Sequence, residues 1–211
     1  MKRIGIALIG ICLLLSSTAF SQSRGIFTIN AGQMNPKDTK SGMIVGAVMS
    51  RAVDDAVDIG LGIDIFHKAY SDESKVAEET ATGLTTSQTA TLVDYTRTVI
   101  PINVALNVKI PMGRYFGYFI RGSMGYSFLI SKEKNYELET SETRKYGGLG
   151  WRGGGGMYYQ VGRRSTLFGE AFFNSNEVSR DVGDKDIGLP VTEHVDLSGL
   201  GFRLGVSLVL R

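Results

Sequence analysis

Residues 100–110 read IPINVALNVKI, and every second residue of this stretch is apolar. The even-numbered positions hold only Ile, Val and Leu, whereas the odd-numbered ones include Asn103, Asn107 and Lys109. Successive side chains of a β-strand point to opposite sides, so this period of two indicates a strand with one apolar and one polar face. The stretch therefore predicts a strand that separates two different environments.

The same alternation recurs along the chain, and no helical period of useful length is present. The further runs cover residues 27–33, 58–65, 116–128, 149–161, 167–173 and 200–210. In residues 43–51 apolar side chains occupy both phases, so the facing of that run stays undecided. Together the runs predict eight antiparallel strands.

The connections between the runs alternate in length. Short turns are expected at residues 53–56, 111–114 and 162–165, and long polar loops at residues 71–91, 131–145 and 175–193. Outer-membrane barrels have short periplasmic turns and longer external loops. A closed barrel also avoids open sheet edges, which cannot exist in lipid. We therefore predict an all-β protein, an eight-stranded antiparallel up-and-down transmembrane β-barrel.

A soluble, lipocalin-like barrel is the alternative, with its apolar faces turned inward around a lipid. The polar faces argue against it, because they are rich in Gly, Ser and Asn, whereas a water-facing surface normally carries many Lys and Glu. Aromatic residues on the apolar faces also fall at two levels, as in the girdles of membrane barrels. Those residues are Phe116, Tyr118 and Tyr159 near the short turns, and Tyr126, Phe128, Trp151 and Phe173 toward the long loops.

Composition excludes several classes of protein. The 211 residues carry a formal net charge of +2 with basic and acidic residues well mixed, so a nucleic-acid partner is not expected. One Cys and two His exclude a disulfide framework and the usual zinc and iron–sulfur sites. We expect no cofactor and no metal.

The N-terminus has the layout of a secretory signal peptide. Lys2 and Arg3 precede an apolar run at residues 4–15, and Ala19 and Ser21 suit the small-residue positions before a cleavage site. We predict a signal peptide at residues 1–21 and an outer-membrane barrel at residues 22–211. Cys12 follows Ile11 rather than a small residue, so lipidation is not expected.

The predicted inward faces carry a few charges at similar height. Because a buried charge must be paired, we predict that Asp64 and Glu170 form one lumen charge network with three arginines, Arg121, Arg152 and Arg203. Asn103 and Asn107 are candidates to extend the network, whereas Asp58 and Lys109 lie nearer the short turns and are expected to be solvated. The network either fills and fixes the lumen or gates a narrow pore.

Catalytic groups are sparse. His67 and His194 are expected at the rim or in a loop, and the His-x-Ser pair of a lipid-A deacylase is absent. The run Gly153–Gly156 lies inside a strand and opens no helix, so it is not a phosphate-binding loop. We do not expect an enzyme.

The whole pattern resembles the small eight-stranded outer-membrane barrels of the OmpA/OmpX type over nearly all of the mature chain. Their C-terminal barrel-assembly signal is matched by Arg203, Gly205, Leu208 and Leu210. The large positions are Leu rather than aromatic, and the chain ends in Arg211 rather than Phe. The resemblance implies an outer-membrane location and recognition by the barrel-assembly machinery.

These features predict a barrel with a largely filled polar lumen and a structural or surface-interaction role. Its expected partners are outer-membrane lipids, the assembly machinery and an external ligand bound through the loops. A narrow channel for ions or small solutes is the alternative, and a lipid-modifying enzyme or a periplasmic lipid-binding barrel is weaker.

Overall fold

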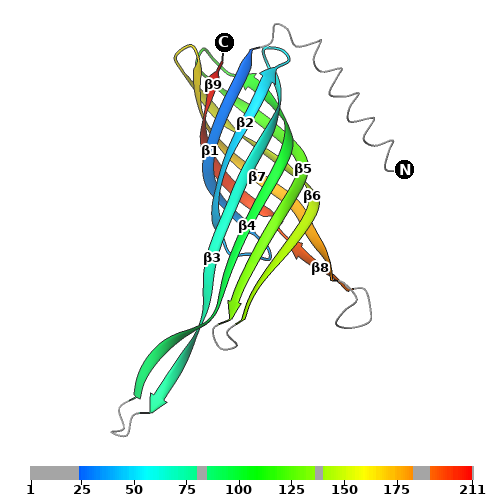
Figure 1. Cartoon of the computed structure of the whole chain (residues 1–211). Helices are drawn as coiled ribbons and strands as arrows, with labels where there is room; N and C mark the ends of the chain where they lie inside the picture. The colour runs from blue at the N-terminus through cyan, green and yellow to red at the C-terminus, as the bar shows by residue number, and fades with distance from the viewer. Residues whose placement is uncertain (1–23, 80–84, 136–139, 183–190, 211) are drawn as a thin grey trace, which may run out of the picture.

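A computed structural model of the chain describes residues 24–79, 85–135, 140–182 and 191–210. The predicted signal peptide lies outside these residues and stays a prediction. The strands are β1 (Gly25–Pro36), β2 (Gly42–Ala52), β3 (Val57–Glu79), β4 (Thr85–Pro111), β5 (Phe116–Asn135), β6 (Thr140–Val161), β7 (Ser165–Val182), β8 (Val191–Asp196) and β9 (Gly199–Val209) (Figure 1). In this described part of the chain, no helix is long and apolar enough to cross a membrane.

The strands close into one antiparallel barrel. Each strand from β1 to β7 pairs with the next, and β9 pairs with both β1 and β7. Within the closing seam Ile29 lies opposite Val206, and Glu170 lies opposite Arg203. Strands β8 and β9 pair with successive parts of β7, so together they occupy one position in the wall, the eighth. The predicted eight-stranded barrel is therefore confirmed.

The eighth wall segment is broken at Leu197 and Ser198. Above the break β8 pairs with β7 through Glu177 and Asp196, and below it β9 pairs with β7 from Asn174 onward. The Leu197 amide still donates to the carbonyl of Asn176 at 2.8 Å. The break turns Leu197 into the lumen, where it is buried.

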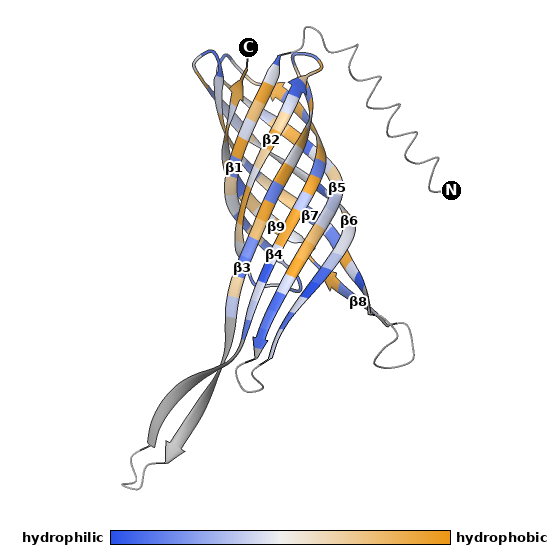
Figure 2. Ribbon diagram, viewed as in Figure 1, coloured by the Kyte–Doolittle hydropathy of each residue, from blue (hydrophilic) through white to orange (hydrophobic). Residues whose placement is uncertain are grey.

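The outer face of the barrel is apolar. Leu61, Met124 and Leu204 are among its most exposed residues, at 64%, 67% and 58%. On β4 the apolar positions run from residue 100 to residue 110, which is ~33 Å along the strand and ~25 Å along the axis at a usual tilt. That height matches the hydrocarbon band of an outer-membrane barrel. In Figure 2 hydrophobic segments lie across the middle of the wall and alternate with more polar ones.

The facing of β2 is settled by the structure. Ile44 is fully buried inside the barrel, whereas Met43, Val45 and Met49 are exposed on its outer face. The sequence left this strand undecided because apolar side chains are present on both of its faces.

The predicted long loops are shorter than expected, which corrects the loop boundaries given above. The strands β3 and β4 remain paired through Glu79 and Thr85, and β5 and β6 through Asn135 and Thr140. The third loop is shortened in the same way, because β7 and β8 pair through Val182 and Val191. Beyond the apolar band water lies on both faces of a strand, so period-two alternation disappears although backbone pairing continues.

Candidate functional site

A layer of charged side chains crosses the lumen near mid-height, and Glu170 lies at its centre. Glu170 is 1% exposed and accepts hydrogen bonds from Arg203 Nε and Nη2, both at 3.0 Å. Arg121 Nη1 donates to Glu170 Oε2 from another strand at 2.8 Å. Both carboxylate oxygens are therefore bound, which is the arrangement that makes a buried charge tolerable.

The second carboxylate of this layer is Asp64. Arg152 Nη1 donates to Asp64 Oδ2 at 2.6 Å, and Arg203 Nη1 lies 3.6 Å from Asp64 Oδ1. Arg203 thus lies between the two carboxylates. The structure brings all the predicted lumen charges together in one layer, with three guanidinium groups and two carboxylates.

Inward-facing glycines make room for these long side chains. A Cβ atom at Gly154 would lie 2.7 Å from the Ala171 carbonyl oxygen and 3.0 Å from Glu170 Oε1. A Cβ at Gly46 would collide with the Asp64 carboxylate. Gly154, in the run Gly153–Gly156, therefore leaves space in the lumen that a larger residue would fill.

Phenylalanine rings complete the packing of the charged layer. The Arg121 guanidinium lies 5.1 Å from the ring centroid of Phe119 and 5.0 Å from that of Phe168. Arg152 and Arg203 lie 4.8 and 5.2 Å from the Phe172 ring. Such contacts bury the flat faces of the guanidinium groups while their edges bind carboxylates.

Asp58 and Lys109, expected to be solvated, instead form an ion pair. Lys109 Nζ lies 2.7 Å from Asp58 Oδ2, and Asn107 donates to the same oxygen at 3.1 Å. Asp58 is only 4% exposed, because the barrel wall shields it from water even near its end. A cavity of about 60 Å³ lies beside this pair, between the short-turn end and Arg121.

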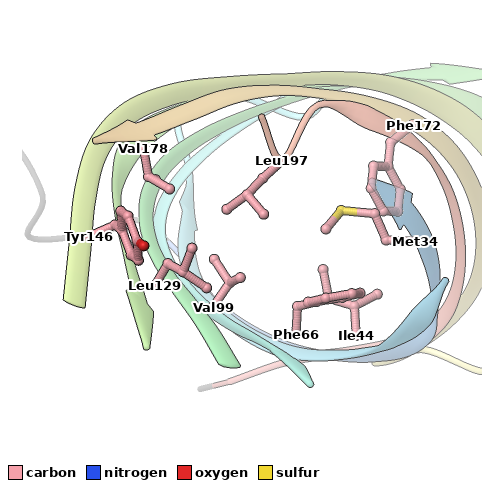
Figure 3. Close-up of a cluster of buried hydrophobic side chains, with 9 residues drawn as sticks. All are labelled: Met34, Ile44, Phe66, Val99, Leu129, Tyr146, Phe172, Val178 and Leu197. Atoms are coloured by element: carbon pink, nitrogen blue, oxygen red, sulfur yellow. The ribbon is translucent and has the colours of Figure 1, made fainter. Parts of the chain in front are cut away.

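An apolar layer fills the lumen on the long-loop side of the charges, so the lumen is not polar throughout. It contains Met34, Ile44, Phe66, Val99, Leu129, Tyr146, Phe172, Val178 and Leu197, which point into the barrel in Figure 3. Sequence reasoning missed this layer because it treated inward faces as polar. A signal was present, since Phe66 and Phe172 lie two residues from Asp64 and Glu170 and share their facing.

The connection between β1 and β2 folds over the mouth of the barrel at the long-loop end. The backbone amides of Lys37 and Asp38 donate to the carbonyls of Ser198 and Asp196 at 2.9 and 3.1 Å. Hydrogen bonds from Ser198, followed by those from Lys37, hold the pKa of Asp196 below its ordinary value. Arg97 donates to the Asp38 carbonyl and to Thr39 Oγ1.

The histidines lie on the outer surface at the rim. His67 Nδ1 lies 3.1 Å from Thr98 Oγ1, and His194 Nδ1 lies 2.9 Å from Glu177 Oε1. Ser179 is the cross-strand neighbour of His194, but among the described residues no hydrogen bond joins them. A nucleophile in contact with its base, on which acyl transfer depends, is not assembled there.

The residues of the predicted assembly signal lie on β9 and just after it. Leu208 and Leu210 are exposed on the apolar outer face, whereas Arg203 belongs to the lumen layer. At Gly205 a Cβ atom would collide with the Phe168 ring. Gly205 is therefore required for packing, and recognition of the signal stays a prediction.

Comparisons with known proteins identify solved structures with a similar fold. No protein-family model matches the chain, and no curated protein matches its sequence. A major outer membrane protein from Thermus thermophilus is similar, with a TM-score of 0.54, 13% identity, and coverage of 88% of this chain and 99% of that one. Ail of Yersinia pestis, in complex with the heparin analogue sucrose octasulfate, has a TM-score of 0.52, 9% identity, and coverage of 89% and 98%.

OprG from Pseudomonas aeruginosa has a TM-score of 0.51 and 14% identity, with coverage of 90% of this chain and 98% of that one. The similarity spans nearly all of each chain at low identity, so it concerns the fold. The protein has the fold of the small eight-stranded outer-membrane β-barrels.

Glu170→Gln should lower the free energy of unfolding by about 3 kcal/mol, because it leaves two buried guanidinium groups without their shared negative charge. Urea unfolding in lipid vesicles, followed by the fluorescence of the single tryptophan, measures the change. The control Glu177→Gln removes an exposed carboxylate and should shift stability by no more than ~0.5 kcal/mol. Equal effects of the two substitutions would contradict the assigned role of Glu170.

Proposed function

We propose that this protein is an outer-membrane barrel with a closed lumen, exported by its signal peptide, that presents an extended β-sheet to an external partner. The short turns then face the periplasm and the long hairpins face the exterior. In this proposal the lumen is a rigid core, and binding takes place outside the membrane.

The layering of the lumen is the observation that supports a lumen closed to ions. Ions that enter from the short-turn end would pass Glu170 and its arginines and then meet side chains that are almost fully buried. Of these, Ile44 is 0% exposed, Phe66 1% and Leu197 1%. An eight-stranded barrel is only wide enough for its own side chains, and an apolar layer of this kind is a poor path for ions.

The hairpin of β3 and β4 supports the surface role. Strand β2 pairs with β3 only as far as His67, and β5 pairs with β4 only from Val93. Beyond His67, residues 68–79 of β3 pair with β4 alone within the described part of the chain, over ~40 Å. An open strand edge of this length is a template for another extended chain. We therefore propose an extended polypeptide segment as the partner.

Replacing residues 73–92 with Asn-Gly should abolish this binding and leave the barrel intact, because Asp72 and Val93 remain paired on either side of a two-residue turn. The measurement is adhesion of cells displaying the protein to wells coated with reduced, carboxymethylated albumin, an unfolded chain, and to wells coated with native albumin. We expect adhesion to the unfolded chain only, lost on truncation.

Two controls define this test. A boiling-dependent shift in gel mobility shows that the truncated barrel still folds. Cells with the same display level but without the protein set the background. Equal adhesion of full-length and truncated forms would remove the hairpin from the proposal.

A gated channel is the second candidate, and the position of Arg203 between two carboxylates favours it, since such a group can exchange partners. Conductance in a planar bilayer separates the two. The wild type should show no discrete steps, and Glu170→Ala should also stay closed, because the apolar layer around Phe66 is untouched. Steps that appear on Glu170→Ala, in protein that keeps its gel shift, would favour the gate.

A further inference from the structure

Exposed arginines gather at the short-turn end of the barrel. They are Arg24 before β1, Arg51 at the end of β2, Arg114 between β4 and β5, and Arg163 with Arg164 between β6 and β7. We propose that this arginine rim binds the phosphate groups of anionic phospholipids in the periplasm-facing leaflet. The inference rests on the proposed orientation, in which the short turns face the periplasm.

Three of the five arginines carry positive charge that the described part of the chain does not neutralise. Among those residues no carboxylate forms an ion pair with Arg114, Arg163 or Arg164. Asp54, one of two acidic residues in the turn after β2, accepts hydrogen bonds from the amides of Ala56 and Val57, both at 2.7 Å. Asp54 and Asp55 bring two negative charges to this end of the barrel, fewer than the five arginines.

The opposite rim is different, because carboxylates there pair with several of its basic groups. Lys37 lies 3.1 Å from Asp196, and Arg180 lies 3.4 Å from Glu193. Arg144 lies 2.6 Å from Glu142. The two ends of the barrel thus differ in the charge they offer to the surroundings, and the short-turn end is the one that attracts anions.

Aromatic side chains place the arginine rim at the level of lipid head groups. Three aromatic side chains are exposed on the outer face at the short-turn end, namely Phe116, Tyr118 and Tyr159. The ring centroids of Phe116 and Tyr118 lie 5.5 Å apart. Such residues mark the membrane–water interface of a barrel. Arg114 precedes Phe116 by two residues, and its guanidinium lies 5.4 Å from the centroid of the Tyr115 ring. This position places Arg114 just beyond the hydrocarbon, where lipid phosphates lie.

The residue type fits the phosphate group. A guanidinium presents parallel N–H donors that bind two phosphate oxygens at once, which lysine does not. The unbalanced positive charge adds a preference for lipids with net negative charge over zwitterionic lipids, and salt screens that preference.

The test uses the full chain reconstituted in phosphatidylcholine vesicles that contain trace spin-labelled phosphatidylglycerol or spin-labelled phosphatidylcholine. The motionally restricted part of the spectrum reports lipid bound at the barrel surface. We expect the wild type to favour phosphatidylglycerol over phosphatidylcholine by ~3- to 10-fold at low salt. The triple variant Arg114→Gln, Arg163→Gln, Arg164→Gln should lower the ratio to about one, as should 1 M salt.

A matched control removes the same number of charges at the other end, through Lys68→Gln, Lys132→Gln and Lys145→Gln, and should keep the preference. An equal loss in both triple variants, or no preference in the wild type, would overturn the proposal. So would arginine-dependent binding to isolated peptidoglycan without any lipid preference, since the partner would then be an acidic polymer. Protein that lacks the boiling-dependent gel shift would instead count against the membrane barrel itself.

Discussion

The charged layer depends on one carboxylate that serves two arginines on different strands. Glu170 on β7 binds Arg203 on the neighbouring β9 and Arg121 on β5, which lies on the other side of β6. The closed wall keeps water away, so each of these charges is stable only with its partners in place. The inward glycines, the phenylalanine rings against the guanidinium groups and the register of the closing seam all serve this one arrangement.

The lumen is divided along its axis into regions with different chemistry. Near the short turns Asp58, Lys109 and a small cavity form a polar end. The shared carboxylates follow at mid-height, and the apolar layer around Phe66 and Leu197 closes the side toward the long hairpins. In the closed state that we propose, the apolar layer is the seal and the charged layer supports it, which is why we propose that function resides on the long hairpins and on the short-turn rim.

Sequence reasoning recovered the fold because the membrane imposes a simple rule. Where one face of a strand touches lipid, apolar residues must occupy every second position, as in residues 100–110. The rule fails where that contrast is absent. On β2 both faces are apolar, and residues 71–79 of β3 are mostly polar in both phases of the sequence. Neither the facing of Ile44 nor the length of the β3–β4 hairpin was therefore visible.

The members of the lumen charge network were predicted from their shared facing, but which arginine binds which carboxylate was not. Glu170 and Arg203 are cross-strand neighbours, whereas Arg152 reaches Asp64 from a strand on another side of the barrel. Such contacts depend on barrel curvature and side-chain length, which no local pattern encodes. Treating every inward position as polar also hid the apolar layer. The expectation that Asp58 and Lys109 are solvated came from their position near the short turns, and it is wrong for Asp58, which is buried.

The central claim is that the apolar faces touch lipid and the charged faces touch one another. Nitroxide labels placed one at a time at residues 100–110, in protein reconstituted in vesicles, test it directly by collision with oxygen, which is enriched in lipid, and with a water-soluble nickel complex. The account predicts oxygen accessibility that peaks at Ile102, Val104 and Leu106 and falls at the odd-numbered positions between them. Peaks of nickel accessibility at those same even-numbered residues would show that the apolar face meets water, and would contradict the account.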